Sequence, residues 1–332
     1  MTTPLIPRRV RATPPIAHDP QRGRVPLPPI LVAFGRVCFA WLRNQYGMRD
    51  LRPLGVYLTR TADFLGLARS QPVVEAAMGS LSVLVSTADR TIARSVYTSG
   101  DWDPLVVGTC FRALDEFGSP FRGSTFLEIG ANFGVYSLRA VADYGFARAV
   151  AYEPDPQSFQ LLEQNISRNG LADRVSAHHA ALSSTPGELT LQLGSRNAGD
   201  NRITASIAGD GETVRVPART LDDDVAAGHL DPADIGLAWL DVQGHEYEVL
   251  LGADSLLESN AALVVEYDTG FMDEATRLGL ERLLAAHYDV MVDLGWCALT
   301  NRVRFQPAAA VARLAADGRH VETDLLLLKL PN

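Results

Sequence analysis

Residues 126–138 read FLEIGANFGVYSL, an apolar strand followed by a glycine turn and the start of a helix. In an open α/β sheet, a nucleotide-like ligand binds where such a strand turns into a helix. The glycines suit this turn, because a Cβ would block a left-handed backbone and the close approach of a ligand. The sequence therefore predicts that four residues of this segment bind a cofactor: Glu128, Gly130, Asn132 and Gly134.

The spacing of these glycines differs from that of dinucleotide-binding proteins. A G-x-G-x-x-G turn would place glycines at positions 132 and 135, where this chain has Asn132 and Val135. Glu128 lies two residues before the first glycine, where its carboxylate attracts an ammonium or sulfonium group and repels a pyrophosphate. The turn therefore favours S-adenosylmethionine over NAD as the ligand.

A second carboxylate follows the next short strand. Residues 149–153 read AVAYE, and Glu153 lies about 20 residues beyond the glycine turn. A carboxylate at this strand end accepts hydrogen bonds from both hydroxyls of a ribose. The structural alternative is that Glu153 caps the helix expected over residues 157–169 and that the glycines allow close packing of helix on sheet. The order of strand, glycine turn, helix, strand and glutamate favours the nucleoside site.

A third strand end carries Asp241 and His245. Residues 235–241 (IGLAWLD) are typical of a buried parallel strand, and we expect the following helix to run through Leu257. His245 comes just after the strand, at the edge of the sheet where ligands bind.

Taken together, these segments resemble the FkbM family of S-adenosylmethionine-dependent methyltransferases. The matching pieces are FLEIGANFGVYS, VAYEPDP, and DVQGHE followed by EVLLGA, and the resemblance covers roughly residues 80–330. It also includes the segment Ala181-Leu182-Ser183, through which Ala181 joins the expected cofactor site. Family members commonly carry a lysine and a glutamate where this chain has Trp239 and Gln243.

The resemblance implies S-adenosylmethionine as cofactor and a methyl acceptor that is a hydroxyl of a sugar, polyketide or other secondary metabolite, free or bound to a carrier. A hydroxyl acceptor benefits from a base, and His245 is the best-placed candidate, with a local capping role as its alternative. Asp241 can orient the acceptor, contact the methionine amine or help hold a cation. The other functions left open are an NAD-dependent reductase and a noncatalytic adenosine-binding module.

Three polar residues are expected to contact the acceptor: Asn201, Arg202 and Glu266. Arg202 lies in a polar loop, where it can clamp a carboxylate or phosphate or remain solvated. Glu266 ends a later strand of the same sheet edge. Tyr97 and Trp102 can cover the ligand or pack in the core.

We predict no metal site, because the chain has no zinc-binding pattern and the sequence alone brings no hard oxygen ligands together.

Composition agrees with a cytoplasmic enzyme of small molecules. The chain has 332 residues, of which 47% are hydrophobic, and a formal net charge of −9. A negative chain without a clustered basic face argues against a nucleic-acid partner. The apolar stretch at residues 30–42 is too short to span a membrane, which needs about 20 residues. The three widely spaced cysteines are expected to be reduced and mostly buried. The composition leaves a homo-oligomer open.

We expect three parts: a disordered, basic, proline-rich arm at residues 1–29, a helical N-terminal extension at residues 30–80, and a methyltransferase domain at residues 81–332. From residue 125 onward, strands alternate with helices, which predicts an α/β fold with a doubly wound, mostly parallel sheet. Residues 182–220 show short alternating runs typical of a hairpin. The last strand, at residues 324–330, is expected to insert antiparallel, as in the Rossmann-like methyltransferases that the chain resembles.

Overall fold

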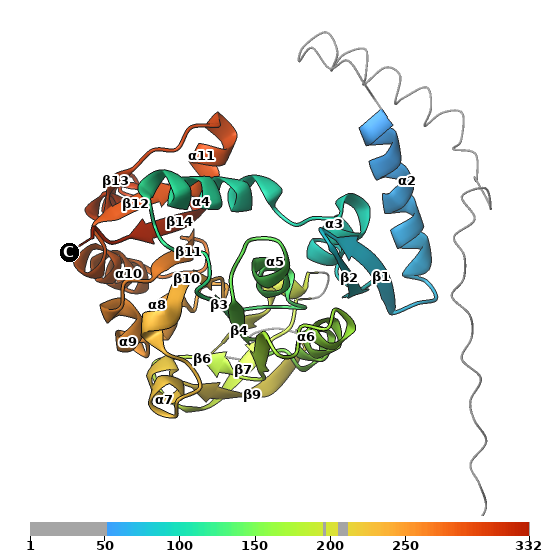
Figure 1. The fold of residues 1–332 in the computed structure, drawn as a ribbon, viewed down its shortest axis with the longest axis horizontal. Coiled ribbons are helices and arrows are strands. Elements are labelled where there is room, and N and C mark those ends of the chain that lie inside the picture. The colour runs from blue at the N-terminus through green and yellow to red at the C-terminus, as the bar shows by residue number, and fades with distance from the viewer. Residues whose placement is uncertain (1–51, 195–196, 205–211, 332) are drawn as a thin grey trace, which may run out of the picture. The chain divides into compact units, whose positions relative to one another are not determined.

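The computed structural model describes residues 52–194, 197–204 and 212–331, and residues 56–332 cluster into one compact unit. Its centre is an eight-stranded sheet with the strand order β13-β12-β14-β11-β10-β3-β4-β5 (Figure 1). All neighbours from β11 to β5 pair in parallel, and β14 inserts antiparallel between β11 and β12. The predicted fold class is therefore confirmed. The strands are β3 (Thr125–Ile129), β4 (Arg148–Tyr152), β5 (Val175–His178), β10 (Ile235–Leu240), β11 (Ala262–Asp268), β12 (Val290–Asp293), β13 (Gln306–Pro307) and β14 (Glu322–Leu328).

Helices cover both faces of this sheet because its strands are apolar on both sides. Along β10, for example, Trp239 belongs to the buried cluster on one face and Leu240 to the cluster on the other, as the alternation of a strand requires. The first face is covered by α4 (Pro104–Phe117), α5 (Val135–Ala142), α6 (Pro156–Arg168) and α11 (Leu294–Thr300). The second face is covered by α7 (Leu221–Ala226), α8 (Glu246–Leu251), α9 (Asp254–Glu258), α10 (Glu274–His287) and the short helix η3 (Ala308–Arg313).

The N-terminal part of the unit is not wholly helical. The helix α2 (Arg52–Leu67) precedes an antiparallel hairpin of β1 (Val73–Met78) and β2 (Leu81–Ser86), which leads into α3 (Ile92–Ser99). The prediction of a helical extension up to residue 80 is therefore wrong at residues 73–78, where alternate side chains are buried as in a strand. The arm predicted at residues 1–29 and the apolar stretch at residues 30–42 lie outside the described residues.

Two asparagines of α6 hold this hairpin against the rest of the unit. The Asn165 side chain accepts a hydrogen bond from the Leu84 N–H at 2.6 Å and donates to the Leu84 carbonyl at 3.0 Å. Asn169, one turn later, makes the same pair of bonds with Ser82, at 3.1 and 2.9 Å. The two side chains take the place of a neighbouring strand and satisfy the free backbone edge of β2.

A smaller four-stranded sheet is inserted after β5, in the order β6-β9-β7-β8. It is made of β6 (Ala181–Leu182), β7 (Gly187–Gln192), β8 (Arg202–Ile203) and β9 (Thr213–Arg219), with the short helix η1 (Ala198–Asp200) before β8. The hairpin predicted between residues 182 and 220 is confirmed by the antiparallel pairing of β7 with β9.

The helix expected to run through Leu257 is interrupted. It ends at Leu251, and α9 begins at Asp254 after a separate turn. A Cβ at Gly252 would lie 2.2 Å from the Ser183 carbonyl oxygen, so only glycine lets this chain pass so close to the segment after β6.

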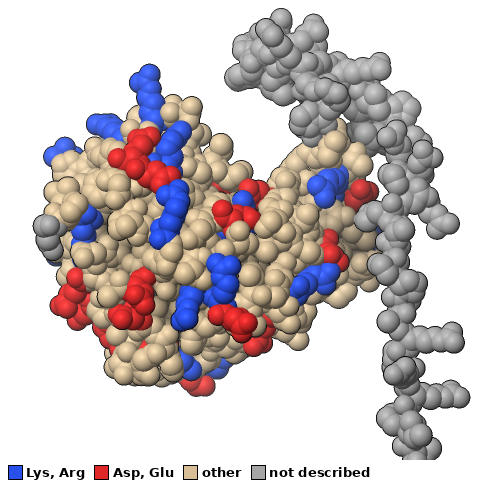
Figure 2. Space-filling model, viewed as in Figure 1, with Lys and Arg blue, Asp and Glu red and all other residues tan. Residues whose placement is uncertain are grey.

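The distribution of charged side chains on the surface and the state of the cysteines agree with the predictions made from the composition. On the face drawn in Figure 2, lysines and arginines are interspersed with aspartates and glutamates instead of forming one basic tract. Within the described ranges, no helix combines the length and the apolar character needed to cross a bilayer. Cys110 and Cys297 are free and buried, as expected, and Cys38 lies outside the described residues.

The turn after β3 explains why two glycines are needed there. Gly130 has φ +92°, and a Cβ on it would lie 1.9 Å from the Asp241 carbonyl oxygen at the end of β10. Gly134 has φ +91°, and its Cβ would lie 2.7 Å from the Leu162 side chain of α6. Both positions therefore need glycine for the packing of the turn against neighbouring elements, which was the structural alternative considered from the sequence.

We predict that Gly130→Ala destabilises the protein much more than Gly118→Ala. Gly118 also has a left-handed backbone, at φ +80°, but a Cβ there meets nothing within 4 Å. The Gly118 variant therefore measures the conformational cost alone, about 1 kcal/mol, whereas the Gly130 variant adds a clash with backbone. Urea unfolding of both variants checks this, and an equal loss of stability would show that the contact with Asp241 is relieved easily.

Candidate cofactor and acceptor site

A pocket lies at the carboxyl ends of β3, β4 and β10, where ligands of open α/β sheets bind. The space inside it, counted together with its open mouth, is about 780 Å³. The pocket brings together eight of the residues predicted from the sequence: Glu128, Gly130, Asn132, Glu153, Ala181, Asn201, Asp241 and His245. Three others do not line it: Gly134, Arg202 and Glu266.

The carboxylate of Glu153 bridges the turns after β3 and β4. One of its oxygens accepts a hydrogen bond from the Asn132 N–H at 2.6 Å, and the other accepts one from the Asp155 N–H at 2.7 Å. Burial raises the pKa of Glu153 to about 8, against the opposing effect of these two hydrogen bonds. Each carboxylate oxygen has a second lone pair, so the group keeps the capacity to accept two further hydrogen bonds from a diol. Asp155, and not Glu153, caps the following helix α6.

Glu128 serves the helix that starts at the glycine turn. Its carboxylate accepts hydrogen bonds from the backbone of Tyr136 at 3.2 Å and Ser137 at 2.8 Å, and from the Ser137 hydroxyl. These are first-turn N–H groups of α5, whose own N-cap residue, Gly134, has no side chain to satisfy them. Burial raises the pKa of Glu128 to about 7. Its carboxylate is thus already engaged with the helix, and its role toward a cationic ligand is electrostatic.

Asp241 and Glu266 converge on one amide. The Gln243 Nε2 donates to an oxygen of Asp241 and to an oxygen of Glu266, each at 2.8 Å. Burial raises the pKa of Asp241, against the lowering effect of its hydrogen bonds with Gln243 and Glu266. Burial, followed by the charge of Asp241, raises the pKa of Glu266. Glu266 does not itself line the pocket, so it reaches the site through Gln243. In the sequence, Gln243 stood out only as a departure from the family. Its contacts with Asp241 and Glu266 arise because β10 and β11 are neighbours in the sheet, which the sequence does not state.

His245 lies at the pocket wall, just before α8. Its Nε2 is 3.0 Å from the Ser183 Oγ, and Nδ1 has no hydrogen-bond partner among the described residues. Burial lowers the pKa of the imidazole, despite the nearby Glu248. The ring is therefore neutral at pH 7 and has one basic nitrogen. Ser183 was not singled out as a site residue, because nothing local to it indicates a contact 62 residues away.

The two loop residues predicted to contact the acceptor separate in the structure. Asn201 lines the pocket, and its side-chain oxygen accepts a hydrogen bond from the Gly194 N–H at 2.8 Å. Arg202 is exposed, points outside the pocket lining, and lies over the Phe271 ring at 5.7 Å. The prediction that Arg202 clamps a substrate is not supported, because alternate residues of the short strand β8 face opposite ways.

Two segments that are far apart in the sequence cover the pocket. Ile92 and Trp102 line it from the N-terminal hairpin region, and Ala198 and Gly199 line it from the inserted sheet. A Cβ at Gly199 would lie 2.9 Å from the Ile92 Cδ1, so the two covers approach each other closely. Trp102 thus has the covering position considered from the sequence, whereas the Tyr97 ring packs at 5.3 Å from the Phe64 ring.

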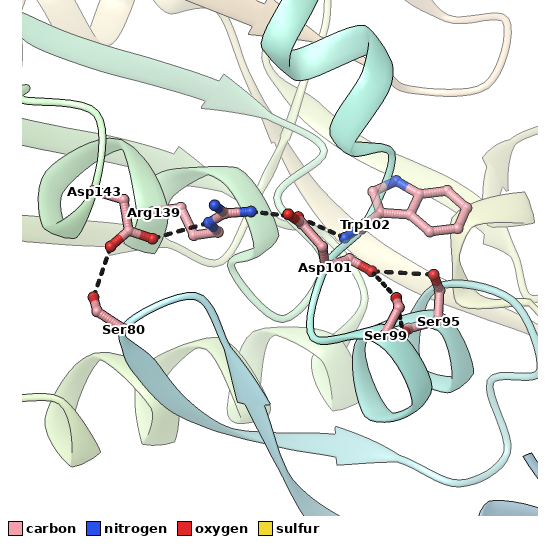
Figure 3. Close-up of polar contacts among 7 residues, drawn as sticks. All are labelled: Ser80, Ser95, Ser99, Asp101, Trp102, Arg139 and Asp143. Carbon is pink, nitrogen blue, oxygen red and sulfur yellow. Dashed lines mark hydrogen bonds and ion pairs between the residues drawn. The ribbon is translucent and has the colours of Figure 1, made fainter. Parts of the chain in front are cut away.

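An ionic network holds the segment that carries Trp102 (Figure 3). Arg139 of α5 pairs with Asp101 and, at 3.0 Å, with Asp143, which in turn accepts a hydrogen bond from the Ser80 hydroxyl at 2.7 Å. Asp101 also accepts a hydrogen bond from the Trp102 N–H at 2.9 Å. The Arg139 side chain is only 14% exposed, so its charge depends on these partners. Through Asp101, the network joins α5, which follows the glycine turn, to the segment whose Trp102 lines the pocket.

The charge of the lining distinguishes between ligands. Three carboxylates line the pocket, those of Glu128, Glu153 and Asp241, and its described lining contains no lysine or arginine. A pyrophosphate would meet repulsion without a counter-charge, whereas a sulfonium or an amine would be attracted. The residues present therefore fit S-adenosylmethionine and do not fit NAD.

Comparison with known protein families identifies the same region. Residues 128–291 match the model of the methyltransferase FkbM domain. Among curated proteins, methyltransferase sdnD of Sordaria araneosa is 27% identical over 172 residues, which cover 44% of this chain and 64% of that protein. The ribosomal protein L11 methyltransferase of a Geobacter species is 34% identical over 82 residues, which cover 24% of this chain and 26% of that protein. This chain thus spans less than two thirds of either relative.

Two solved structures are similar to the chain at low identity and low TM-score. The FkbM methyltransferase of Methylobacillus flagellatus has a TM-score of 0.34 and 15% identity, with 89% of this chain and 70% of that chain covered. TYW2 of Pyrococcus horikoshii, solved in complex with MeSAdo, has a TM-score of 0.39 and 16% identity, with 79% of this chain and 73% of that chain covered.

We predict that Arg139→Met destabilises the protein by about 2 kcal/mol, because it leaves two partly buried carboxylates without their cation. The matched control is Arg122→Met, which breaks an ion pair with Asp115 whose side chains are 60% and 48% exposed, and which should destabilise the protein much less. Urea unfolding gives both values. Equal costs would mean that the Arg139 network does not hold the cover of the pocket.

Proposed function

Because residues 128–291 match the model of the methyltransferase FkbM domain, we propose that the protein transfers the methyl group of S-adenosylmethionine to a hydroxyl of a small or carrier-bound acceptor such as a sugar or polyketide. The observation that supports this best is the pocket at the glycine turn, lined by three carboxylates and, among its described residues, by no lysine or arginine. S-adenosylmethionine supplies an electrophilic methyl group on a positively charged sulfur.

The cofactor would be held by residues of three strand ends. Glu153 would accept hydrogen bonds from the two ribose hydroxyls, since its orientation is set by the backbone of Asn132 and Asp155. Asp241 lines the same pocket and would attract the ammonium group of the methionine part. Ala181 belongs to the apolar wall of the pocket, against which a flat adenine ring would pack.

His245 is the proposed base for the acceptor hydroxyl. If its Nε2–H donates to the Ser183 Oγ, the bond at 3.0 Å fixes the ring and leaves Nδ1 as the nitrogen that accepts a proton. The lowered pKa keeps this nitrogen free at neutral pH. Asp241 and Glu266 suit a different task. Their raised pKa values favour a shared proton, so they would not remove the proton of the acceptor. Asp241 would contact the ligand directly, and Glu266, which does not line the pocket, would act through Asp241 and Gln243.

A noncatalytic adenosine-binding protein is the alternative, because Trp239 and Gln243 stand where the family commonly has a lysine and a glutamate. It predicts cofactor binding without turnover on a panel of sugar and polyketide hydroxyls. Methyl transfer from labelled S-adenosylmethionine to any of these acceptors would exclude this alternative.

For the cofactor, we predict that Glu153→Gln weakens the binding of S-adenosylhomocysteine by at least about tenfold, roughly 1.4 kcal/mol. The amide would turn one N–H donor toward the backbone N–H groups that now hold the carboxylate, and it would lose acceptor capacity for the diol. Calorimetry measures the change. Glu163→Gln, the same substitution at an exposed position of α6, is the control and should bind as the unchanged protein does. Unchanged affinity in the Glu153 variant would remove this residue from the site.

For the base, we predict that His245→Gln lowers kcat at least about a hundredfold and changes the affinity for S-adenosylhomocysteine less than threefold. In the unchanged protein, kcat should rise with pH through a pKa below 6.5 and be constant at neutral pH, because burial favours the neutral imidazole. The variant should lose this rise. A pH profile that is the same in both proteins would rule out His245 as the base.

A further inference from the structure

Outside the pocket, three side chains that can ligate a metal come together on two paired strands. They are Asp268 at the end of β11, Glu322 at the start of β14, and His320 just before β14. Each offers one ligand atom, and these atoms all lie within 4.8 Å of one another. The closest two, the His320 Nε2 and the Asp268 Oδ1, are 2.7 Å apart.

The strand pairing places all three on one side of the ladder. Asp268 is directly opposite Glu322 in the antiparallel pairing of β11 with β14. His320 precedes Glu322 by two residues, and residues two apart along an extended chain face the same way. The ladder continues past the strand end, because the Thr269 N–H donates to the Val321 carbonyl and the Val321 N–H donates to the Thr269 hydroxyl, both at 2.9 Å. The ligands therefore stand on a paired backbone.

A glycine keeps space beside the ligand atoms. A Cβ at Gly270 would lie 2.9 Å from the His320 Nε2 and 3.0 Å from the Asp268 Oδ1. The Gly270 N–H also donates to that Asp268 oxygen at 2.7 Å, which orients the carboxylate. Asp268 is buried, and His320 and Glu322 are exposed, so the cluster has a fixed inner ligand and an open outer side.

The surroundings of the cluster are negative. Glu266 and Asp324 also pair with each other, two residues away from Asp268 and Glu322 on the same two strands. They therefore face the same side of the sheet as that pair. In the described part of the chain, no lysine or arginine forms an ion pair with any of these four carboxylates. The cluster is acidic, and among the described residues His320 is the only side chain that forms an ion pair with these carboxylates, which suits a bound cation.

We propose that Asp268, His320 and Glu322 bind a divalent transition-metal ion through one imidazole nitrogen and two carboxylate oxygens. One nitrogen and two oxygens suit Zn²⁺ or Mn²⁺, whereas Mg²⁺ and Ca²⁺ prefer oxygen alone. Ligand atoms at about 2.1 Å from one ion lie about 3.0 Å apart in octahedral and about 3.4 Å apart in tetrahedral geometry, so the contact of 2.7 Å between His320 and Asp268 needs to open by roughly 0.3 to 0.7 Å. The ion would replace the shared proton of this contact.

This inference goes beyond the proposed function and does not depend on it, because metal binding is measured without a methyl acceptor or cofactor. It also differs from the expectation of no metal site. The sequence offered no such pattern because Asp268 and His320 are 52 residues apart and become neighbours only through the insertion of β14 beside β11.

The test is calorimetric titration of the full chain, free of affinity tag and treated with EDTA, with ZnCl₂ and separately with MnCl₂. We expect one ion per chain with a Kd in the micromolar range for at least one of the two metals. His320→Ala and Glu322→Gln should each weaken binding at least about tenfold. Both residues are exposed, so these variants should fold, which circular dichroism checks. The matched control His287→Ala, on α10, should bind as the unchanged chain does.

Two results would overturn the proposal. The first is the absence of binding of either metal below millimolar concentration. The second is binding that persists unchanged in the double variant His320→Ala/Glu322→Gln, which would place the ion elsewhere on the chain. With Co²⁺, visible absorption bands that appear in the unchanged chain and are lost in His320→Ala would provide a second, spectroscopic measure of imidazole ligation.

Discussion

The site depends on the carboxylate of Glu153, which accepts hydrogen bonds from the backbone of Asn132 after β3 and of Asp155 after β4. These two bonds join the turns that follow neighbouring parallel strands. They also fix the direction of a buried group whose pKa is raised to about 8, so that its lone pairs are presented to the pocket. Loss of this bridge would free both turns at once, together with the backbone that lines the ligand site.

The electrostatics of the pocket follow from the residues at the strand ends. Glu128, Glu153 and Asp241 follow three adjacent strands, and parallel strands bring their carboxyl ends to one edge. Trp239, where family members commonly have a lysine, instead contacts the Tyr136 ring, with centroids 4.5 Å apart. The site thus lacks the cation common in the family and leaves a positive charge to be supplied by the ligand.

The pocket is covered by a segment that precedes the family match and by a segment inserted within it. The N-terminal hairpin carries the cover formed by Ile92 and Trp102, and it is held by the asparagines of α6 and by the Arg139 network (Figure 3). The inserted sheet supplies the second cover at Gly199. Both covers line the pocket, so their side chains take part in deciding which ligands fit it.

The sequence alone determined the features that depend on a few neighbouring residues. Alternation of apolar residues placed the strands, the glycines marked the turn after β3, and Glu153 and Asp241 were located at strand ends. Tertiary structure alone decided contacts between distant segments: the approach of Gly130 to Asp241, the bond of His245 to Ser183, the exposure of Arg202, and the cluster of Asp268, His320 and Glu322. The reason is physical. Periodicity and turn chemistry are local, whereas these contacts depend on the order in which strands pair, which no short segment encodes.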